Sequence, residues 1–176
     1  MAAITKPGSV ICEVGVFQGE FADFLLRLQP KRLTLIDPWE GTLTSGNADG
    51  NNVVQIDGEK TFRIISEKCK GVPCIEIHRA KSEDVLQKFP DEYFDVIYID
   101  GDHSFEGCYK DLELARRKVK KGGWICGHDY EMNELKAKNV YCFGVNQAVD
   151  VFCLKNNLKV RALGLDGCVS YAIPNL

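Results

Sequence analysis

The chain has 176 residues, of which 45% are hydrophobic and 27% are charged, and its formal net charge is −3. This balance is typical of a folded globular protein, so we expect a single domain over residues 1–176. The small negative charge excludes an extensive basic surface that would hold nucleic acid through its phosphates. No stretch approaches the roughly 20 apolar residues of a membrane-spanning helix, and we predict a cytoplasmic protein with no membrane partner.

The cysteines favour a reducing compartment. Four of the eight cysteines fall within apolar patterns of predicted strands or helices: Cys12, Cys108, Cys126 and Cys153. Cysteines in such patterns behave as small buried hydrophobic residues and remain reduced. The chain has no C-x-x-C motif, and Cys69 and Cys74 have no second pair at zinc-binding spacing. We therefore expect neither disulfides nor a cysteine-bound metal.

The first predicted unit is a strand, a glycine-containing loop and a helix. Val10–Val14 is a short apolar run, and Gly15 and Gly19 follow it. A helical apolar rhythm then begins, at Phe21, Phe24, Leu25 and Leu28. In an open α/β sheet, such a turn lies at the carboxyl end of a strand, where nucleotide-like ligands bind. Glycines at this point would let the backbone approach a ligand closely.

The spacing in this loop indicates the kind of ligand. A dinucleotide site requires G-x-G-x-x-G, which places a pyrophosphate at the helix N-terminus. Here Glu13 precedes Gly15, and three residues separate Gly15 from Gly19. This wider, acidic loop favours a cationic ligand without phosphates. The alternative is a glycine-containing turn that binds nothing.

The second quarter of the chain predicts further alternating elements. Arg32–Ile36 is a buried strand that ends at Asp37, and residues 40–58 form a polar loop, too long for a simple connection. A helix with an apolar face follows, with Phe62, Ile65 and Cys69 on that face. After the strand Ile75–Arg79, Ser82 is the predicted N-cap of a short helix. Its apolar residues are Val85, Leu86 and Phe89.

The remaining chain predicts a central strand and a terminal hairpin. Phe94–Ile99 is the most continuous apolar run. Ser104 caps a long helix with apolar positions 105, 108, 112, 115 and 119, which Gly122 and Gly123 close. A strand over 124–126, a helix over 145–154 and strands over 159–163 and 170–173 follow. The last two strands are joined only by a short Gly-Leu-Asp-Gly turn (164–167), so they must pair antiparallel.

Alternating strands and helices predict an α/β fold with a doubly wound, mostly parallel sheet. Four acidic residues lie at or near the carboxyl ends of predicted strands: Glu13, Asp37, Asp100 and Asp129. In a doubly wound sheet, these ends share one edge. Asp37 can accept hydrogen bonds from ribose hydroxyls or can simply begin a turn before Pro38. Trp39 can cover an adenine or pack against the loop.

Two further segments, Tyr98–Glu106 and Gly122–Tyr130, resemble class I S-adenosylmethionine-dependent methyltransferases. The resemblance is to the small-molecule O-methyltransferase branch that includes macrocin-type sugar enzymes, and with the N-terminal loop it covers nearly the whole chain. It implies a Rossmann-like fold of seven strands in the order 3-2-1-4-5-7-6, with a C-terminal antiparallel hairpin. It also implies methyl transfer from S-adenosylmethionine to a small-molecule acceptor, at a hydroxyl oxygen.

The resemblance assigns residues to the cofactor and to a metal. The expected cofactor residues are Glu13, Gly15, Phe17, Gly19, Asp37, Trp39, Ser82, Glu83 and Asp100. The implied ligands of a divalent metal, magnesium or manganese, are Asp100, His128 and Asp129. Oxygen donors are usual at the position of His128, so an alternative is that His128 is a bystander. A second alternative is that the two aspartates bond cofactor and backbone without a metal.

His103 is the first candidate for the catalytic base, with Asp100 and Asp102 as alternatives. Methyl transfer is a displacement at a sulfonium, so the acceptor must be aligned and deprotonated. A bound metal would lower the pKa of the acceptor hydroxyl. One departure from the family pattern is Phe21, at a position where many relatives hold the methionine carboxylate with Ser or Thr.

Two other functions remain open from the sequence. A nicotinamide-dependent oxidoreductase is disfavoured by the missing G-x-G-x-x-G motif, and a non-catalytic S-adenosylmethionine-binding module is disfavoured by the Asp100, His103 and Asp129 set. The chain begins close to its first strand, so we expect residues 40–58, residues 131–144 or another subunit of a homo-oligomer to cover the substrate.

Overall fold

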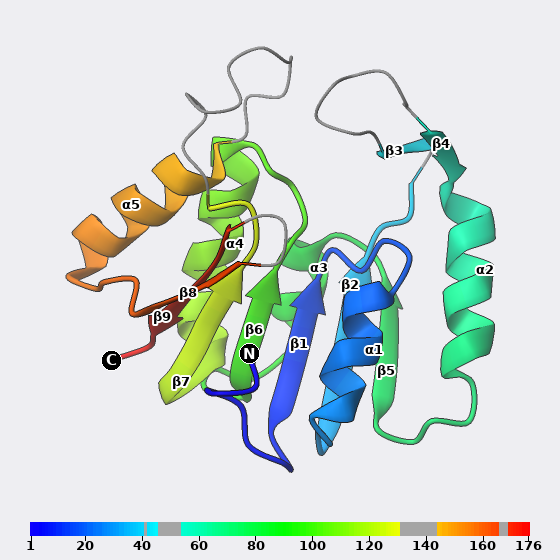
Figure 1. Ribbon diagram of the computed structural model, residues 1–176, viewed down its shortest axis with the longest axis horizontal. Coiled ribbons are helices and arrows are strands. Elements are labelled where there is room, and N and C mark those ends of the chain that lie inside the picture. The colour runs from blue at the N-terminus through cyan, green and yellow to red at the C-terminus, as the bar shows by residue number, and fades with distance from the viewer. Residues whose placement is uncertain (41, 46–53, 131–143, 166–168) are drawn as a thin grey trace.

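The computed structural model describes residues 1–40, 42–45, 54–130, 144–165 and 169–176. Seven strands form one twisted sheet with helices on both faces (Figure 1). These strands are β1 (Val10–Val14), β2 (Arg32–Asp37), β5 (Ile75–Arg79), β6 (Phe94–Ile99), β7 (Val119–Gly127), β8 (Ala162–Leu165) and β9 (Val169–Pro174). The helices are α1 (Glu20–Arg27), α2 (Gly58–Cys69), α3 (Ser82–Leu86), α4 (Phe105–Lys118) and α5 (Val145–Asn156).

The strand order confirms the predicted topology. The sheet runs β5-β2-β1-β6-β7-β9-β8, which is the order 3-2-1-4-5-7-6 when its strands are numbered along the chain. β1 pairs in parallel with β2 and β6, and β9 pairs antiparallel with both β7 and β8. The carboxyl ends of β1, β2 and β6 therefore meet at one edge, as the positions of the acidic residues require.

Side chains that alternate along the strands divide the core between the two faces of the sheet. On β6, Val96 and Tyr98 join the apolar cluster that packs under α1 and α2, while Ile97 and Ile99 join the cluster under α3, α4 and α5. Figure 1 shows α1 and α2 in front of the sheet and α4 behind it. Burial on both faces explains why β6 is so continuously apolar.

The segment after β2 differs from the predicted loop over residues 40–58. Two short strands, β3 (Thr42–Ser45) and β4 (Val54–Asp57), pair antiparallel as a separate two-stranded sheet. The Asp57 side chain then caps α2 by accepting the Lys60 amide, 3.2 Å away. Polar composition does not prevent strand pairing when main-chain hydrogen bonds hold the strands. Residues 41 and 46–53 of this predicted loop lie outside the described residues.

Two boundaries in the second half also differ from the prediction. Helix α4 ends at Lys118, and β7 begins at once with the buried Val119, which pairs with Phe94. Gly122 and Gly123 thus lie inside β7, where the register with β6 shifts; a side chain at Gly123 would lie 2.6 Å from the Asp95 carbonyl oxygen. The other boundary is at β8, which covers 162–165 instead of 159–163 and keeps the antiparallel pairing.

The cysteines agree with the sequence analysis where they are described. Four of them are buried and free: Cys12, Cys108, Cys126 and Cys153. Cys69 and Cys74 are also free and half-buried, while Cys142 and Cys168 lie outside the described residues. Within the described ranges, no helix combines the length and the apolar character needed to cross a membrane.

Candidate active site

The loop after β1 is held against the neighbouring strand ends by its own backbone. Gly15 and Gly19 have φ angles of 85° and 76°, a region that side chains disfavour. A Cβ on Gly15 would collide with the Asp100 carbonyl group, and one on Gly19 would lie 2.7 Å from Ile65. The added atoms would meet protein, so each glycine is required by the packing of the loop, and the close approach of a ligand to this loop stays a prediction.

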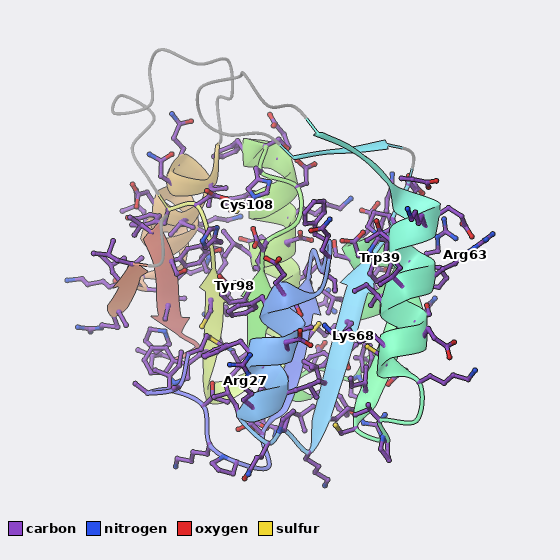
Figure 2. The ribbon with its side chains drawn as sticks, turned by 45° about the vertical axis from the view of Figure 1, so that its right-hand side comes forward. Arg27, Trp39, Arg63, Lys68, Tyr98 and Cys108 are labelled. Atoms are coloured by element: carbon purple, nitrogen blue, oxygen red, sulfur yellow. The ribbon has the colours of Figure 1, made fainter. Side chains whose placement is uncertain are left out.

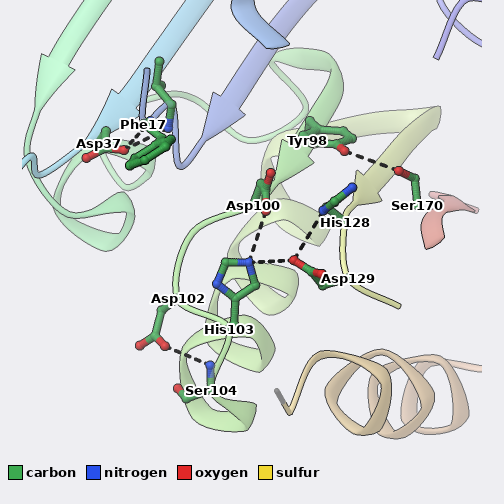
Figure 3. A network of polar contacts seen from close by, with 11 residues as sticks. Phe17, Asp37, Tyr98, Asp100, Asp102, His103, Ser104, His128, Asp129 and Ser170 are labelled. Carbon is green, nitrogen blue, oxygen red and sulfur yellow. Dashed lines mark hydrogen bonds and ion pairs between the residues drawn. The ribbon is translucent and has the colours of Figure 1, made fainter. Parts of the chain in front are cut away.

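Asp37 fastens this loop to the end of β2. Its Oδ2 accepts hydrogen bonds from the amides of Val16 and Phe17, both at 2.9 Å, and its Oδ1 accepts the Trp39 amide at 2.7 Å. Figure 3 shows Asp37 beside Phe17. A carboxylate has about four acceptor sites, so these three bonds leave capacity for a ribose hydroxyl, and that contact stays a prediction.

Trp39 has a packing role in this structure. Its side chain is fully buried, its indole donates a 2.9 Å hydrogen bond to the Phe17 carbonyl, and its ring packs on Phe62 with centroids 5.2 Å apart. The bond to Phe17 ties the same loop from a second direction. Of the two roles considered from the sequence, the observed contacts correspond to packing against the loop.

Glu13 is a buried acid beneath the loop. Its side chain is 2% exposed, and its Oε2 has no hydrogen-bond partner among the described residues. Burial raises the pKa of the Glu13 carboxyl well above its usual value, and the negative charges of Asp100 and Asp37 raise it further. A buried acid with an unused oxygen is a candidate partner for a polar or cationic group of a ligand.

Ser82 does not cap α3 as the sequence predicts. It is the first residue of the helix, and its hydroxyl donates a hydrogen bond to Asp111 of α4. Burial raises the pKa of the Asp111 carboxyl to about 6. Next to Ser82, Glu83 forms an ion pair with Lys110. The adenine contacts expected for Ser82 and Glu83 stay predictions.

Sequence reasoning missed Asp111, although a signal for it was present. It lies at a buried position of α4, on the stripe defined by Cys108, Leu112 and Ala115. An acid on the apolar face of a predicted helix indicates a buried polar partner. That the partner is Ser82 depends on how α3 packs on α4.

A cluster of three side chains forms where β6 and β7 end. His103 Nε2 lies 3.2 Å from Asp100 Oδ1 and 2.9 Å from Asp129 Oδ2 (Figure 3). One nitrogen or oxygen atom from each of the three residues lies within 4.8 Å of the other two. Asp129 has a φ of 56°, an uncommon backbone conformation of the kind that concentrates at functional sites.

His128 and Asp102 lie beside this cluster, outside the group of three. His128 Nδ1 lies 3.3 Å from Asp129 Oδ2, so it contacts one carboxylate of the cluster. Asp102 is exposed and accepts the Ser104 amide at 2.9 Å. Ser104 in turn caps α4 as predicted, because its hydroxyl accepts the Gly107 amide. The structure thus brings His103, rather than His128, between the two aspartates.

The charges in the cluster stabilise one another. Burial alone would lower the pKa of His103, but hydrogen bonds and negative charge from Asp100 and Asp129 outweigh burial and raise it to about 9. Burial would likewise raise the pKa of Asp129, but hydrogen bonds from His103 and His128 hold it well below its usual range. The two carboxylates thus favour the protonated form of His103 between them, and the same three residues could hold a metal ion.

Solved structures share this fold at low sequence identity. Fibrillarin of Aeropyrum pernix, with natively bound S-adenosyl-L-methionine, has a TM-score of 0.64 at 12% identity over 96% of this chain and 67% of its own. The N-methyltransferase NodS of Bradyrhizobium japonicum WM9, in complex with S-adenosyl-L-homocysteine, has a TM-score of 0.64 at 16% identity, over 96% of this chain and 79% of its own. Ribosomal protein L11 methylase of Lactobacillus delbrueckii subsp. bulgaricus has a TM-score of 0.60 at 15% identity, over 97% of this chain and 71% of its own.

No curated protein matches the chain by sequence. The family model Methyltransf_24, described as a methyltransferase domain, matches residues 12–130. This range begins in β1 and ends just after Asp129, so it includes the glycine loop, Asp37 and all three members of the cluster. It covers well over half of the sequence, and the chain belongs to this methyltransferase-domain family.

Proposed function

We propose that the chain transfers a methyl group from S-adenosylmethionine to a hydroxyl oxygen of a small-molecule acceptor, in the cytoplasm, with the help of a divalent metal ion. The observation that carries this proposal is the convergence of Asp100, His103 and Asp129, whose ligand atoms lie within 4.8 Å of one another. The cluster follows β6 and β7, next to the loop after β1 that belongs to the same family match.

The loop after β1 and the acids around it would bind the methyl donor. S-adenosylmethionine carries a sulfonium and an ammonium group and no phosphate. Glu13 and Asp37 lie at the end of β1 and of β2, and Asp100 follows β6, so acidic groups lie on both sides of Gly15. The negative charge of the two aspartates and the unused oxygen of Glu13 suit a cationic donor, and the aspartates oppose the pyrophosphate of a nicotinamide cofactor. This charge is the reason for preferring methyl transfer to hydride transfer.

The cluster fits a divalent ion by the chemistry of its donors. Two carboxylate oxygens and one imidazole nitrogen are ligands that manganese accepts readily, and magnesium prefers oxygen. A bound ion would lower the pKa of a coordinated acceptor hydroxyl. His128 would then orient Asp129 through its 3.3 Å contact instead of binding the ion itself.

The reaction requires three tasks of these residues. They must hold the acceptor oxygen in line with the carbon–sulfur bond, assist loss of its proton and exclude water. As the oxygen–carbon bond forms, the carbon–sulfur bond breaks and its electrons stay on sulfur, so S-adenosylhomocysteine leaves without the sulfonium charge. Asp100 and Asp129 would hold the cation that offsets the negative charge of the deprotonated oxygen, and the proton that the acceptor loses would pass to solvent.

The donor assignment is tested by thermal shift with S-adenosylhomocysteine, with NAD and without ligand. A ligand that binds only the folded state raises the melting temperature, and we expect the rise with S-adenosylhomocysteine. A rise with NAD alone would overturn the assignment. A panel of hydroxyl acceptors with isotope-labelled methyl donor then identifies a substrate.

The metal assignment is tested by Mn²⁺ calorimetry on the protein and on three variants. Asp129→Asn and His103→Gln should lose Mn²⁺ affinity, and the exposed Asp102→Asn should keep it. Asn tolerates the left-handed backbone at position 129, so Asp129→Asn changes charge and little else. If turnover on the identified acceptor survives exhaustive chelation, and Mn²⁺ binds all variants alike, the metal assignment is wrong and His103 becomes the metal-free base.

A further inference from the structure

A cavity of about 520 Å³ opens on the face of the sheet that carries α1. Its floor is formed by strand residues Tyr98, Cys126 and Ala172, and its walls include Phe21 and Phe24 of α1 and Leu163 of β8. None of the described side chains that line it is acidic or basic. A mainly apolar cavity of this size is typical of small-molecule sites.

Aromatic rings dominate one wall of this cavity. Phe21 stacks on Tyr98 with centroids 4.1 Å apart and on Phe24 with centroids 5.5 Å apart. In Figure 2, Tyr98 lies between α1 and the edge of the sheet formed by β9 and β8. Flat aromatic ligands gain from stacked and edge-to-face contacts with such rings, beyond the burial of their surface. The cavity therefore favours a flat ligand over a branched aliphatic one.

The polar end of the cavity lies toward the catalytic cluster. The Tyr98 hydroxyl is 3.5 Å from Ser170 Oγ, at the long limit of a hydrogen bond. Tyr98 pairs with Cys126 across β6 and β7, and it precedes Asp100 by two residues, about 7 Å along a strand. Figure 3 shows His128 between the Tyr98–Ser170 pair and Asp129.

We propose that this cavity binds the aromatic part of the methyl acceptor, with its hydroxyl-bearing end at Tyr98 and Ser170. The inference rests on the proposed function, because it names the substrate class of the same site. The reacting hydroxyl would then point from the cavity toward Asp100, His103 and Asp129. Phe21 has a role in this arrangement, since it lines the cavity and stacks on Tyr98.

The test uses 2-naphthol as a flat, hydroxyl-bearing probe and inositol as a polar control, both measured by calorimetry. Ala162→Trp should fill the cavity from its rim on β8, and Val151→Trp adds the same side chain on the exposed surface of α5. We expect 2-naphthol to bind the unmodified protein and Val151→Trp equally, and to bind Ala162→Trp at least about tenfold more weakly. Inositol should not bind.

A second variant covers the case in which Ala162→Trp fails to fold. Leu163 lines the cavity and is 62% exposed, so Leu163→Glu should fold and place a charge in the apolar wall. Unchanged 2-naphthol affinity in the folded cavity variants would overturn the proposal. The proposal would also be overturned if 2-naphthol does not bind, the unmodified protein is a dimer, and both cavity variants are monomers. A second copy of the chain would then occupy the cavity.

Titration of S-adenosylhomocysteine separates this inference from the function on which it rests. If S-adenosylhomocysteine binds and 2-naphthol does not, the donor site stands and the cavity proposal falls. If 2-naphthol binds and the cavity variants abolish it, while S-adenosylhomocysteine fails to bind, the cavity is a ligand site and the methyl-transfer assignment falls.

Discussion

The loop after β1 and the cluster after β6 and β7 lie at the same edge of the sheet but are built differently. In the loop, the Asp37 carboxylate accepts hydrogen bonds from three backbone amides, and Gly15 lies against the Asp100 carbonyl group. In the cluster, His103 and two aspartates interact through side chains that remain partly exposed. The loop therefore depends on main-chain geometry, and the cluster depends on charge.

This difference has a consequence for mutations. Changes in the loop should damage folding and donor binding together, because the same contacts support both. Changes at His103 and Asp129 of the cluster should damage chemistry while donor binding survives.

Gly15→Val should have the largest effect. The substitution adds a left-handed backbone penalty and a collision with the Asp100 backbone, so we expect a loss of about 3 kcal/mol or more in urea unfolding. Gly8→Val is the matched control, since Gly8 has a φ of 83° and no atom near its added Cβ. Equal losses in the two variants would show that the close approach to Asp100 is unimportant.

Asp37→Ala should destabilise the protein by about 2 to 3 kcal/mol, because three amides lose a charged acceptor. S-adenosylhomocysteine affinity should fall with it. Asp57→Ala is the control, since it removes an exposed helix cap, which costs about 1 kcal/mol, and should leave ligand affinity unchanged. If calorimetry shows full affinity in folded Asp37→Ala, Asp37 does not shape the donor site.

Asp111 should make stability depend on pH. Its bond to Ser82 joins α3 to α4, which carries the cluster at its start. Because its folded pKa of about 6 exceeds the ordinary value of 3.8, its contribution is fully present below pH 3.8 and is lost as pH rises through 6. Asp111→Asn should remove this loss, which is about 1.4 kcal/mol between pH 5 and pH 8. Parallel pH profiles of the two proteins would contradict the assignment.

His103→Gln should cost the least, about 1 kcal/mol, because a partly exposed ion pair contributes little to folding. Its effect should instead appear as lost Mn²⁺ affinity and turnover, with S-adenosylhomocysteine affinity unchanged. A large loss of donor affinity in this variant would mean that the two regions are not separable in the way their contacts indicate.

Much of the fold followed from local pattern. The alternation of periodicity along the chain predicted most of the main-sheet strands and the helices, and the short last connection predicted the hairpin. The predicted ends of helices and strands were wrong where local and long-range interactions compete. Gly122 and Gly123 are typical of a helix end, but Val119 pairs with Phe94 and draws the segment into β7. The pairing of β3 with β4 likewise depends on main-chain hydrogen bonds that composition does not register.

For the site, the sequence determined which acids lie at the edge of the sheet, because strand ends in a parallel sheet point the same way. It did not determine which side chains meet. His103 and His128 are both close to an aspartate in sequence, and only the approach of the α4 N-terminus to the end of β7 places His103 between Asp100 and Asp129. The pairing of Ser82 with Asp111 and of Tyr98 with Ser170 was decided in the same way. Contacts between distant segments depend on how packed elements are placed, and local periodicity carries no information about that placement.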